Sequence, residues 1–258
     1  MPVTLEICAN SLASAIAAQQ GGAQRVELCD NLPEGGTTPS YATIAMARER
    51  LHIALYPIIR PRGGDFLYDA LEFALMQKDI TLCKQLGCDG VAIGLLTADG
   101  QVDKVRTRKL VSLAWPMDVT FHRAFDMTAN PVQALEDIIE TGCERVLTSG
   151  QRNTAEEGAA VIAALVKQAA GRIAVMAGSG VRAHNIAALV AATGANEFHT
   201  TARAYVESGM TYRNPQVSMG GIPGVPEYGI ALTQAAEVQK IRAAAQQAWE
   251  ALHAEDQA

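Results

Sequence analysis

Several features are scarce in this sequence, and each scarcity excludes a class of protein. No uncharged apolar stretch reaches 18 residues, and the amino terminus has neither a basic segment nor a continuous apolar one. We therefore expect no membrane span and no export signal. Positive charge is also scarce, because 21 Lys and Arg against 27 Asp and Glu give a net charge of −6. Nucleic acid and anionic membrane surfaces are accordingly poor partners.

Cysteine and lysine are few as well. An odd number of cysteines scattered over a long chain does not suit a disulfide framework, so we expect free thiols in a reduced, cytoplasmic protein. The five are Cys8, Cys29, Cys83, Cys88 and Cys143. The six lysines all fall on expected helices, which leaves no strand-end amine for a Schiff base. His-X-His pairs are absent, which disfavours a catalytic zinc site of the kind that barrels carry.

Apolar residues are plentiful, at 49% against 19% charged, and predict a globular chain with a sizeable core. Short β-branched or apolar runs predict eight strands, at residues 4–8, 25–29, 53–60, 89–95, 117–122, 145–149, 173–178 and 196–201. They alternate with segments of helical periodicity, at residues 11–20, 40–50, 68–86, 103–114, 130–141, 154–170, 183–193 and 231–252.

This alternation predicts an α/β fold, a single TIM-like (β/α)8 barrel over residues 1–258, because such barrels usually span roughly 250 residues. An open doubly wound sheet is the alternative, but the chain has no GxGxxG fingerprint. Residues 202–230, rich in glycine and proline, are expected to form one long loop that acts as a lid or as an oligomer contact.

Alternating side-chain direction in the first two strands predicts polar groups inside the barrel. In TLEIC, Leu5 and Ile7 share one face, whereas Glu6 and Cys8 share the other. RVELC repeats the pattern. Since the apolar faces must meet the surrounding helices, the lumen should receive four side chains, those of Glu6, Cys8, Glu27 and Cys29. Buried carboxylates need partners, so a cation or a hydrogen-bond donor must lie near.

Later strands also end in polar residues, namely Arg60, His122 and His199. The carboxyl ends of barrel strands are where active sites are built, so these groups predict a site at that end. An alternative is structural: Glu6 and Glu27 pair with Arg60 and other arginines to hold the barrel together. We weight it less, because closing a barrel is expected to use apolar layers.

Loops after three strands suit an anion. RPRGGDF follows the third strand, where Arg60 and Arg62 can form paired hydrogen bonds to a carboxylate or phosphate. Gly178-Ser179-Gly180 follows the seventh strand and Ser149 ends the sixth, so their amide groups can hold an anion. A tight turn without a ligand explains the two glycines as well.

Seven sequence motifs resemble those of the CutC family of copper homeostasis proteins. They are LEIC (5–8), RVELC (25–29), EGGTTPS (34–40), IIRPRGGDF (58–66), VTFHRAFD (119–126), RVLTSG (145–150) and EFH (197–199). The resemblance runs in order from residue 3 to about residue 219. It implies a TIM-like barrel, a cytosolic location, homo-oligomers and a copper(I) site. The ligands it implies are Cys8 and Cys29.

Two functions therefore remain open beside a purely structural scaffold. Copper(I) is soft and accepts two thiolates, and two cysteines that end neighbouring strands on one face suit it, although buried cysteines are often inert. The other function is acid–base chemistry, either metal-independent or metal-assisted, on a small anionic, sugar-like or phosphate-like metabolite. Its candidate residues are Glu6 or Glu27 as base, His122 as acid, Arg60 as anion clamp and Asp126 as an orienting group, together with Arg123 and His199.

Overall fold

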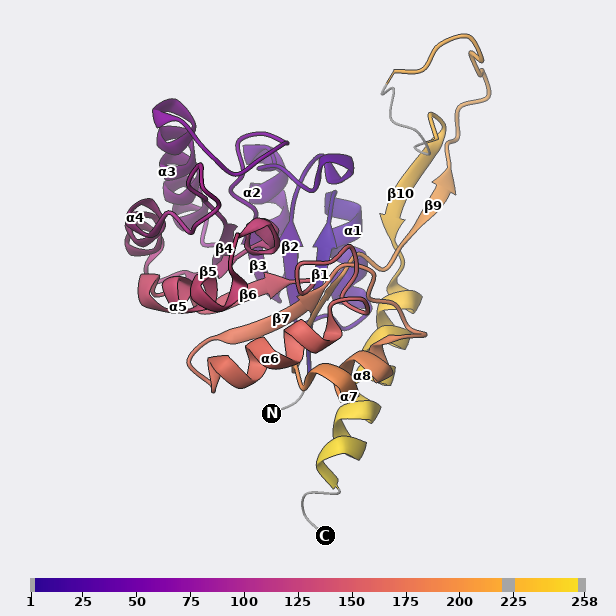
Figure 1. Cartoon of the computed structure of the whole chain (residues 1–258). Helices are drawn as coiled ribbons and strands as arrows, with labels where there is room; N and C mark the ends of the chain where they lie inside the picture. The colour runs from indigo at the N-terminus through magenta and orange to yellow at the C-terminus, as the bar shows by residue number, and fades with distance from the viewer. Residues whose placement is uncertain (1–2, 220–225, 255–258) are drawn as a thin grey trace.

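Eight parallel strands form one sheet in the computed structural model, which describes residues 3–219 and 226–254 (Figure 1). The strand order is β3-β2-β1-β8-β7-β6-β5-β4. A parallel bridge from Ile58 to Ala92 and a hydrogen bond from Ile59 N to Ala92 O join the two outer strands, so the sheet curls into a nearly closed barrel. The single TIM-like (β/α)8 barrel is confirmed.

The strands lie close to their predicted positions. They are β1 (Thr4–Ala9), β2 (Arg25–Leu28), β3 (Ala54–Pro57), β4 (Gly90–Ile93), β5 (Asp118–Phe121), β6 (Arg145–Thr148), β7 (Ala174–Gly178) and β8 (Glu197–Thr200). Their outward side chains pack against the helices in one apolar core that includes Leu5, Ile7, Val26 and Phe121. These strands are buried on both faces, as a parallel barrel requires.

Eight α-helices cover the barrel or follow it. They are α1 (Leu12–Gln20), α2 (Tyr41–Arg50), α3 (Ala70–Gln85), α4 (Lys104–Ala114), α5 (Pro131–Thr141), α6 (Ala159–Ala169), α7 (Ile186–Thr193) and α8 (Ala235–Ala254) among the described residues. Side-chain oxygens of Ser11, Ser40 and Asn130 accept hydrogen bonds from first-turn amides and fix where three of them begin. Two short 3-10 helices, η1 (Leu32–Glu34) and η2 (Arg123–Met127), follow strands β2 and β5.

The segment predicted as a loop at 202–230 contains structure. Strands β9 (Arg203–Glu207) and β10 (Gly229–Thr233) form an antiparallel hairpin that projects from the barrel (Figure 1). The expectation of one long irregular loop is therefore wrong at both of its ends, and α8 begins at residue 235 rather than 231. The glycines and prolines that suggested a loop lie between the two strands, and part of that stretch, 220–225, lies outside the described residues.

Ion-paired side chains fill the amino-terminal half of the barrel lumen. Arg25 donates through Nε to Glu6 and through Nη2 to Glu197 at 2.5 Å. Arg145 donates to the same Glu197 oxygen at 2.6 Å. The Arg25 guanidinium also lies 5.2 Å from the centre of the Tyr56 ring. The expectation that apolar layers alone close the barrel is thus wrong. Part of the lumen is filled by charged side chains, and each of them is paired with a side chain of opposite charge.

The structural alternative, in which Glu6 pairs with Arg60 and other arginines, is wrong for Arg60 and confirmed for another arginine. Arg60 donates to the carbonyl oxygens of Glu34, Gly36 and Gly64 at 2.7–2.8 Å, and to no carboxylate in the described part of the chain. The carboxylate of Glu6 instead meets Arg25, which starts the neighbouring strand.

Removing one charge from this network should destabilise the fold. We expect Glu6→Gln to lower the free energy of unfolding by about 3–5 kcal/mol, because Arg25 then loses a buried partner. In the folded chain the pKa of Glu6 lies well below 4.5, its usual value in an unfolded chain. Ionised Glu6 therefore stabilises the fold fully above about pH 4.5, and this stabilisation is lost as the pH falls below that value. Urea unfolding at pH 7 and pH 4 measures both effects, and the difference from wild type should shrink at the lower pH.

The matched control is Glu207→Gln, which breaks the exposed Glu207–Arg213 ion pair on the hairpin. It should change the free energy of unfolding by less than about 1 kcal/mol. A Glu6→Gln effect as small as that of the control would contradict a stabilising role for the network.

Candidate functional site

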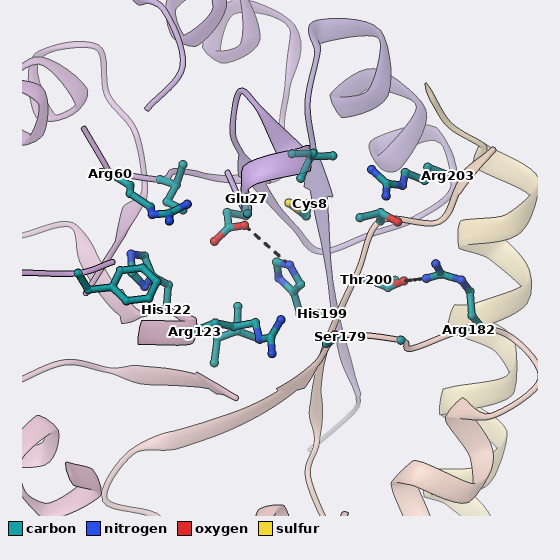
Figure 2. A pocket seen from close by; sticks show the side chains of 17 residues that line it. Cys8, Glu27, Arg60, His122, Arg123, Ser179, Arg182, His199, Thr200 and Arg203 are labelled. Carbon is teal, nitrogen blue, oxygen red and sulfur yellow. Dashed lines mark hydrogen bonds and ion pairs between the residues drawn. The ribbon is translucent and has the colours of Figure 1, made fainter. Parts of the chain in front are cut away.

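A cavity of about 300 Å³ opens at the carboxyl ends of the barrel strands. Figure 2 shows Cys8, Glu27 and His199 at its centre, with Arg60 and His122 on one side. Its lining combines a carboxylate, a thiol, two imidazoles and four arginines, and the arginines are Arg60, Arg123, Arg182 and Arg203. The volume suits a small metabolite, and several polar groups converge on it from separate strands.

The two predicted carboxylates have opposite environments. Glu6 lies beneath the cavity, and although burial opposes its ionisation, the charge of Arg25 and a 2.6 Å hydrogen bond with His199 Nδ1 hold its pKa well below the usual range. Glu27 lines the cavity, and burial raises its pKa. The nearest opposite charge is His199, whose Nε2 lies 3.7 Å from Glu27 Oε2. Glu6 is therefore fixed as an anion, whereas Glu27 is able to exchange a proton.

His199 connects the two carboxylates from strand β8. Burial disfavours its charged form, but the charge of Glu27, a hydrogen bond that the ring donates to Cys8, and Glu6 together raise the pKa of His199 well above its usual value. The imidazolium therefore persists at neutral pH. Because Glu6 holds the Nδ1 side of the ring, the Nε2 side is directed toward Glu27 (Figure 2).

His122 has the opposite protonation state. Burial and the charge of Arg60 lower its pKa to about 3, so the ring is neutral. Its Nδ1 accepts the backbone N–H of Ala124 at 3.1 Å, which places the ring proton on Nε2. Nε2 is buried and has no protein partner in the described part of the chain. This donor lines the cavity and is available to a ligand oxygen.

A glycine makes room for this ring. A Cβ atom at Gly94, directly after β4, would lie 2.4 Å from Cε1 and Nδ1 of His122. The bare backbone at Gly94 therefore allows the ring to sit against the neighbouring strand, with the Phe66 ring 5.3 Å away on another side.

Asp126 organises the loops after β5 and β6. It accepts hydrogen bonds from Arg123 Nε at 2.7 Å, from Thr148 Oγ1 at 2.6 Å, and from the amide and hydroxyl of Ser149. Arg123 Nη2 also donates to Ser149 Oγ at 2.8 Å. Asp126 and Ser149 thus hold the Arg123 guanidinium at the cavity wall without lining the cavity themselves.

The two thiols implied by the family resemblance are in contact. Cys8 Sγ lies 3.4 Å from Cys29 Sγ. Cys8 lines the cavity, whereas Cys29 lies behind it and is 1% exposed. The hydrogen bond with Cys29 and burial raise the pKa of Cys8, so this thiol is protonated when no metal is bound. Ligand atoms of Cys8, Glu27 and His199 lie within 4.8 Å of one another and form a group able to hold a metal ion.

A family model of CutC matches residues 3–204. The chain belongs to the CutC family. CutC family proteins from Chromobacterium violaceum and Bacteroides thetaiotaomicron are 62% and 52% identical to it, over 95% and 90% of this chain and 98% and 94% of their own lengths. The crystal structure of a CutC protein from Streptococcus agalactiae, named for copper homeostasis, has a TM-score of 0.74 at 35% identity. It covers 77% of this chain and 98% of that one.

More distant barrels share only the fold with this CutC chain. Thiamine phosphate pyrophosphorylase from Pyrococcus furiosus, for example, has a TM-score of 0.59 at 11% identity and covers 95% of this chain and 96% of that one. In the described part of the chain, no helix is both long enough and apolar enough to cross a membrane.

The predicted site residues of this CutC chain separate into two groups. The cavity brings together Cys8, Glu27, Arg60, His122, Arg123, His199 and Gly180. The others lie outside its lining: Glu6 beneath it, Cys29 behind Cys8, Asp126 and Ser149 behind Arg123, Arg62 in ion pairs with Asp65 and Glu72, and Gly178 packed against Leu147 and His199.

Three arginines of functional interest were missed. Arg25 shares the inward face of β2 with Glu27, so side-chain alternation could have found it. Arg182 follows the Gly178-Ser179-Gly180 loop that was singled out, and Arg203 begins a strand inside the expected loop. Without the hairpin, the sequence offered no signal that Arg203 reaches the cavity.

The protonation state of His122 can be measured directly. We expect its imidazole nitrogens to show a neutral ring with the proton on Nε2 throughout about pH 5–8, because its pKa lies at about 3. Nitrogen-15 NMR of histidine-labelled protein reports ring tautomers, and His122→Gln assigns the signal. A His122 ring that takes up a proton within this range would contradict the assignment of a neutral donor.

Proposed function

We propose that the chain is an enzyme that performs acid–base chemistry on a small anionic metabolite at the carboxyl end of the barrel. The observation that carries this proposal is the contrast between two buried carboxylates. Glu6 is held as an anion by Arg25 and His199, whereas Glu27 has a raised pKa and lines the cavity. Environments that push the pKa values of neighbouring acids apart are typical of groups with separate acid–base roles.

Glu27 is assigned as the group that exchanges a proton with the substrate. Its raised pKa brings it closer to neutral pH, where a carboxylate is a more effective base. The His199 imidazolium, anchored by Glu6, stabilises the ionised form of Glu27 and orients it. Glu6 and His199 are therefore positioning residues in this proposal.

His122 is assigned as a hydrogen-bond donor to a substrate oxygen. With a pKa of about 3, it has no imidazolium proton to give at neutral pH, so the hydrogen bond from Nε2 replaces the acid role expected from the sequence. Such a donor stabilises negative charge that develops on an oxygen when Glu27 takes a proton from the substrate. Arg60 and Arg123 add positive charge to the same cavity.

Glu27→Gln tests the enzyme directly. In a screen of phosphorylated and carboxylated metabolites, followed by mass spectrometry, wild type should convert at least one compound. Glu27→Gln should lower kcat for it by about 10²- to 10⁴-fold, because the general base is lost. For wild type, kcat/KM should rise as the pH increases through the raised pKa of Glu27, since the base acts when ionised.

Glu49→Gln, an exposed glutamate on α2, is the control and should keep wild-type turnover. Turnover by Glu27→Gln equal to that of wild type would remove Glu27 from the chemistry. A wild-type protein inert toward the whole screen would count against an enzyme.

A second function, copper(I) binding, is favoured by the 3.4 Å contact between Cys8 and Cys29. Soft thiolates suit copper(I), and His199 offers a further nitrogen ligand nearby. The copper would be cargo that enters through the cavity lined by Cys8, because Cys29 is 1% exposed. Binding must release thiol protons, since the pKa of Cys8 is raised.

Copper(I) titration under anaerobic, reducing conditions tests this second function. The bound stoichiometry should fall in Cys8→Ser and in Cys29→Ser, and it should stay at the wild-type value in Cys143→Ser, a buried cysteine outside this site. An unchanged stoichiometry in both site variants would remove the copper function.

We also propose a cytoplasmic homo-oligomer, as the family resemblance implies. All five cysteines are free thiols, which suits a reducing compartment. The projecting hairpin exposes Tyr205, Val206 and Ile230, and exposed apolar side chains of this kind are typical of contacts between chains.

A further inference from the structure

Two arginines at one side of the cavity lack acidic partners. Figure 2 shows Arg182 and Arg203 on the side of His199 away from Arg60 and His122. Within the described residues, the Arg182 side chain donates only to the Val181 carbonyl at 2.9 Å and to Thr200 Oγ1 at 3.4 Å. The Arg203 side chain makes no hydrogen bond or ion pair with any residue in 3–219 or 226–254. By contrast, Arg123 is paired with Asp126 and Arg60 is held by three carbonyls.

The backbone beside these arginines also suits an anion. Ser179 and Gly180 both have φ of 73°, a left-handed conformation that is uncommon for serine. Gly180 lines the cavity, and within the described residues its N–H has no acceptor. An amide group in a turn that has no acceptor within the protein is free to bind an anion, and loops after the seventh and eighth strands are where barrels often bind phosphate. Thr201 also lines the cavity, whereas the Thr200 hydroxyl is already engaged, because it donates to the Val181 carbonyl at 2.7 Å.

The charge of the cavity contrasts with that of the chain. Four arginines and a single carboxylate, Glu27, line the cavity. The whole chain nevertheless carries a net charge of −6. Positive charge is therefore concentrated at this opening, and a ligand with two negative charges gains more from it than a ligand with one.

We infer that Arg182 and Arg203 bind a phosphate group, so that the substrate class is a small phosphate monoester. Two guanidinium groups can donate pairs of parallel hydrogen bonds to phosphate oxygens, which a lone amine cannot do. The phosphate lies on the Arg182 and Arg203 side, and the reacting carbon lies toward Glu27 and His122. This inference rests on the proposed function, whose acid–base groups occupy the other side of the cavity.

Binding of inorganic phosphate tests the subsite without turnover. Isothermal titration calorimetry at constant ionic strength should show that wild type binds phosphate more tightly than acetate. Arg182→Met and Arg203→Met should each weaken phosphate binding by about 10-fold or more, as the loss of charged hydrogen bonds predicts. Arg108→Met, which removes one positive charge from exposed α4, should bind as wild type does.

Thermal unfolding of each variant verifies that it is folded. If either variant is unfolded, Arg182→Lys and Arg203→Lys replace the methionine variants, and they should still weaken phosphate binding because lysine lacks the paired donors. Phosphate binding by both folded single variants that equals the binding by wild type would overturn the subsite. The subsite would also be overturned if wild type bound phosphate no more tightly than acetate.

The two proposals fail differently. Loss of phosphate binding in the arginine variants, together with full activity of Glu27→Gln, would support the subsite and refute the acid–base assignment. Conversely, a substrate whose KM is unchanged in Arg182→Met and Arg203→Met, but whose kcat falls in Glu27→Gln, would overturn the subsite and leave the enzyme.

Discussion

The contact among Arg25, Glu6 and His199 determines the electrostatics of the barrel interior. Taking charged groups out of water costs several kcal/mol for each ion unless other charges and hydrogen bonds compensate. Here Arg25 compensates Glu6, and Glu6 in turn compensates His199. The result is a fixed imidazolium facing Glu27, the remaining carboxylate at the cavity. The protonation of the site therefore depends on an arginine that never reaches the cavity.

Much of the fold followed from the sequence, because short apolar runs typical of buried parallel strands alternate with longer helical segments. Side-chain alternation also placed Glu6, Cys8 and Glu27 inside the barrel, as the structure has them. What alternation cannot give is distance across the lumen. The choice of Arg25 rather than Arg60 as the partner of Glu6 depends on strand register and on carbonyl oxygens that occupy Arg60, and neither is visible in the sequence.

The hairpin shows a different obstacle. Strand β9 alternates polar and apolar residues, but glycine and proline are frequent in 202–230 and suggested a loop. The pairing of β9 with β10 joins segments more than twenty residues apart, so no local window contains the signal. Because β9 begins at Arg203, the missed element also concealed one of the cationic groups at the cavity. Because strand β9 was not predicted, Arg203 was also absent from the predicted site.

Gly94 illustrates how a residue without functional groups can govern chemistry. The neutral ring of His122 occupies the volume that any side chain at position 94 would need. Strands β4 and β5 are consequently fitted to each other at this point, and a methyl group added after one would displace the imidazole that follows the other. A search for active-site positions that ranks residues by reactivity would overlook Gly94, although the His122 ring fits only because Gly94 has no side chain.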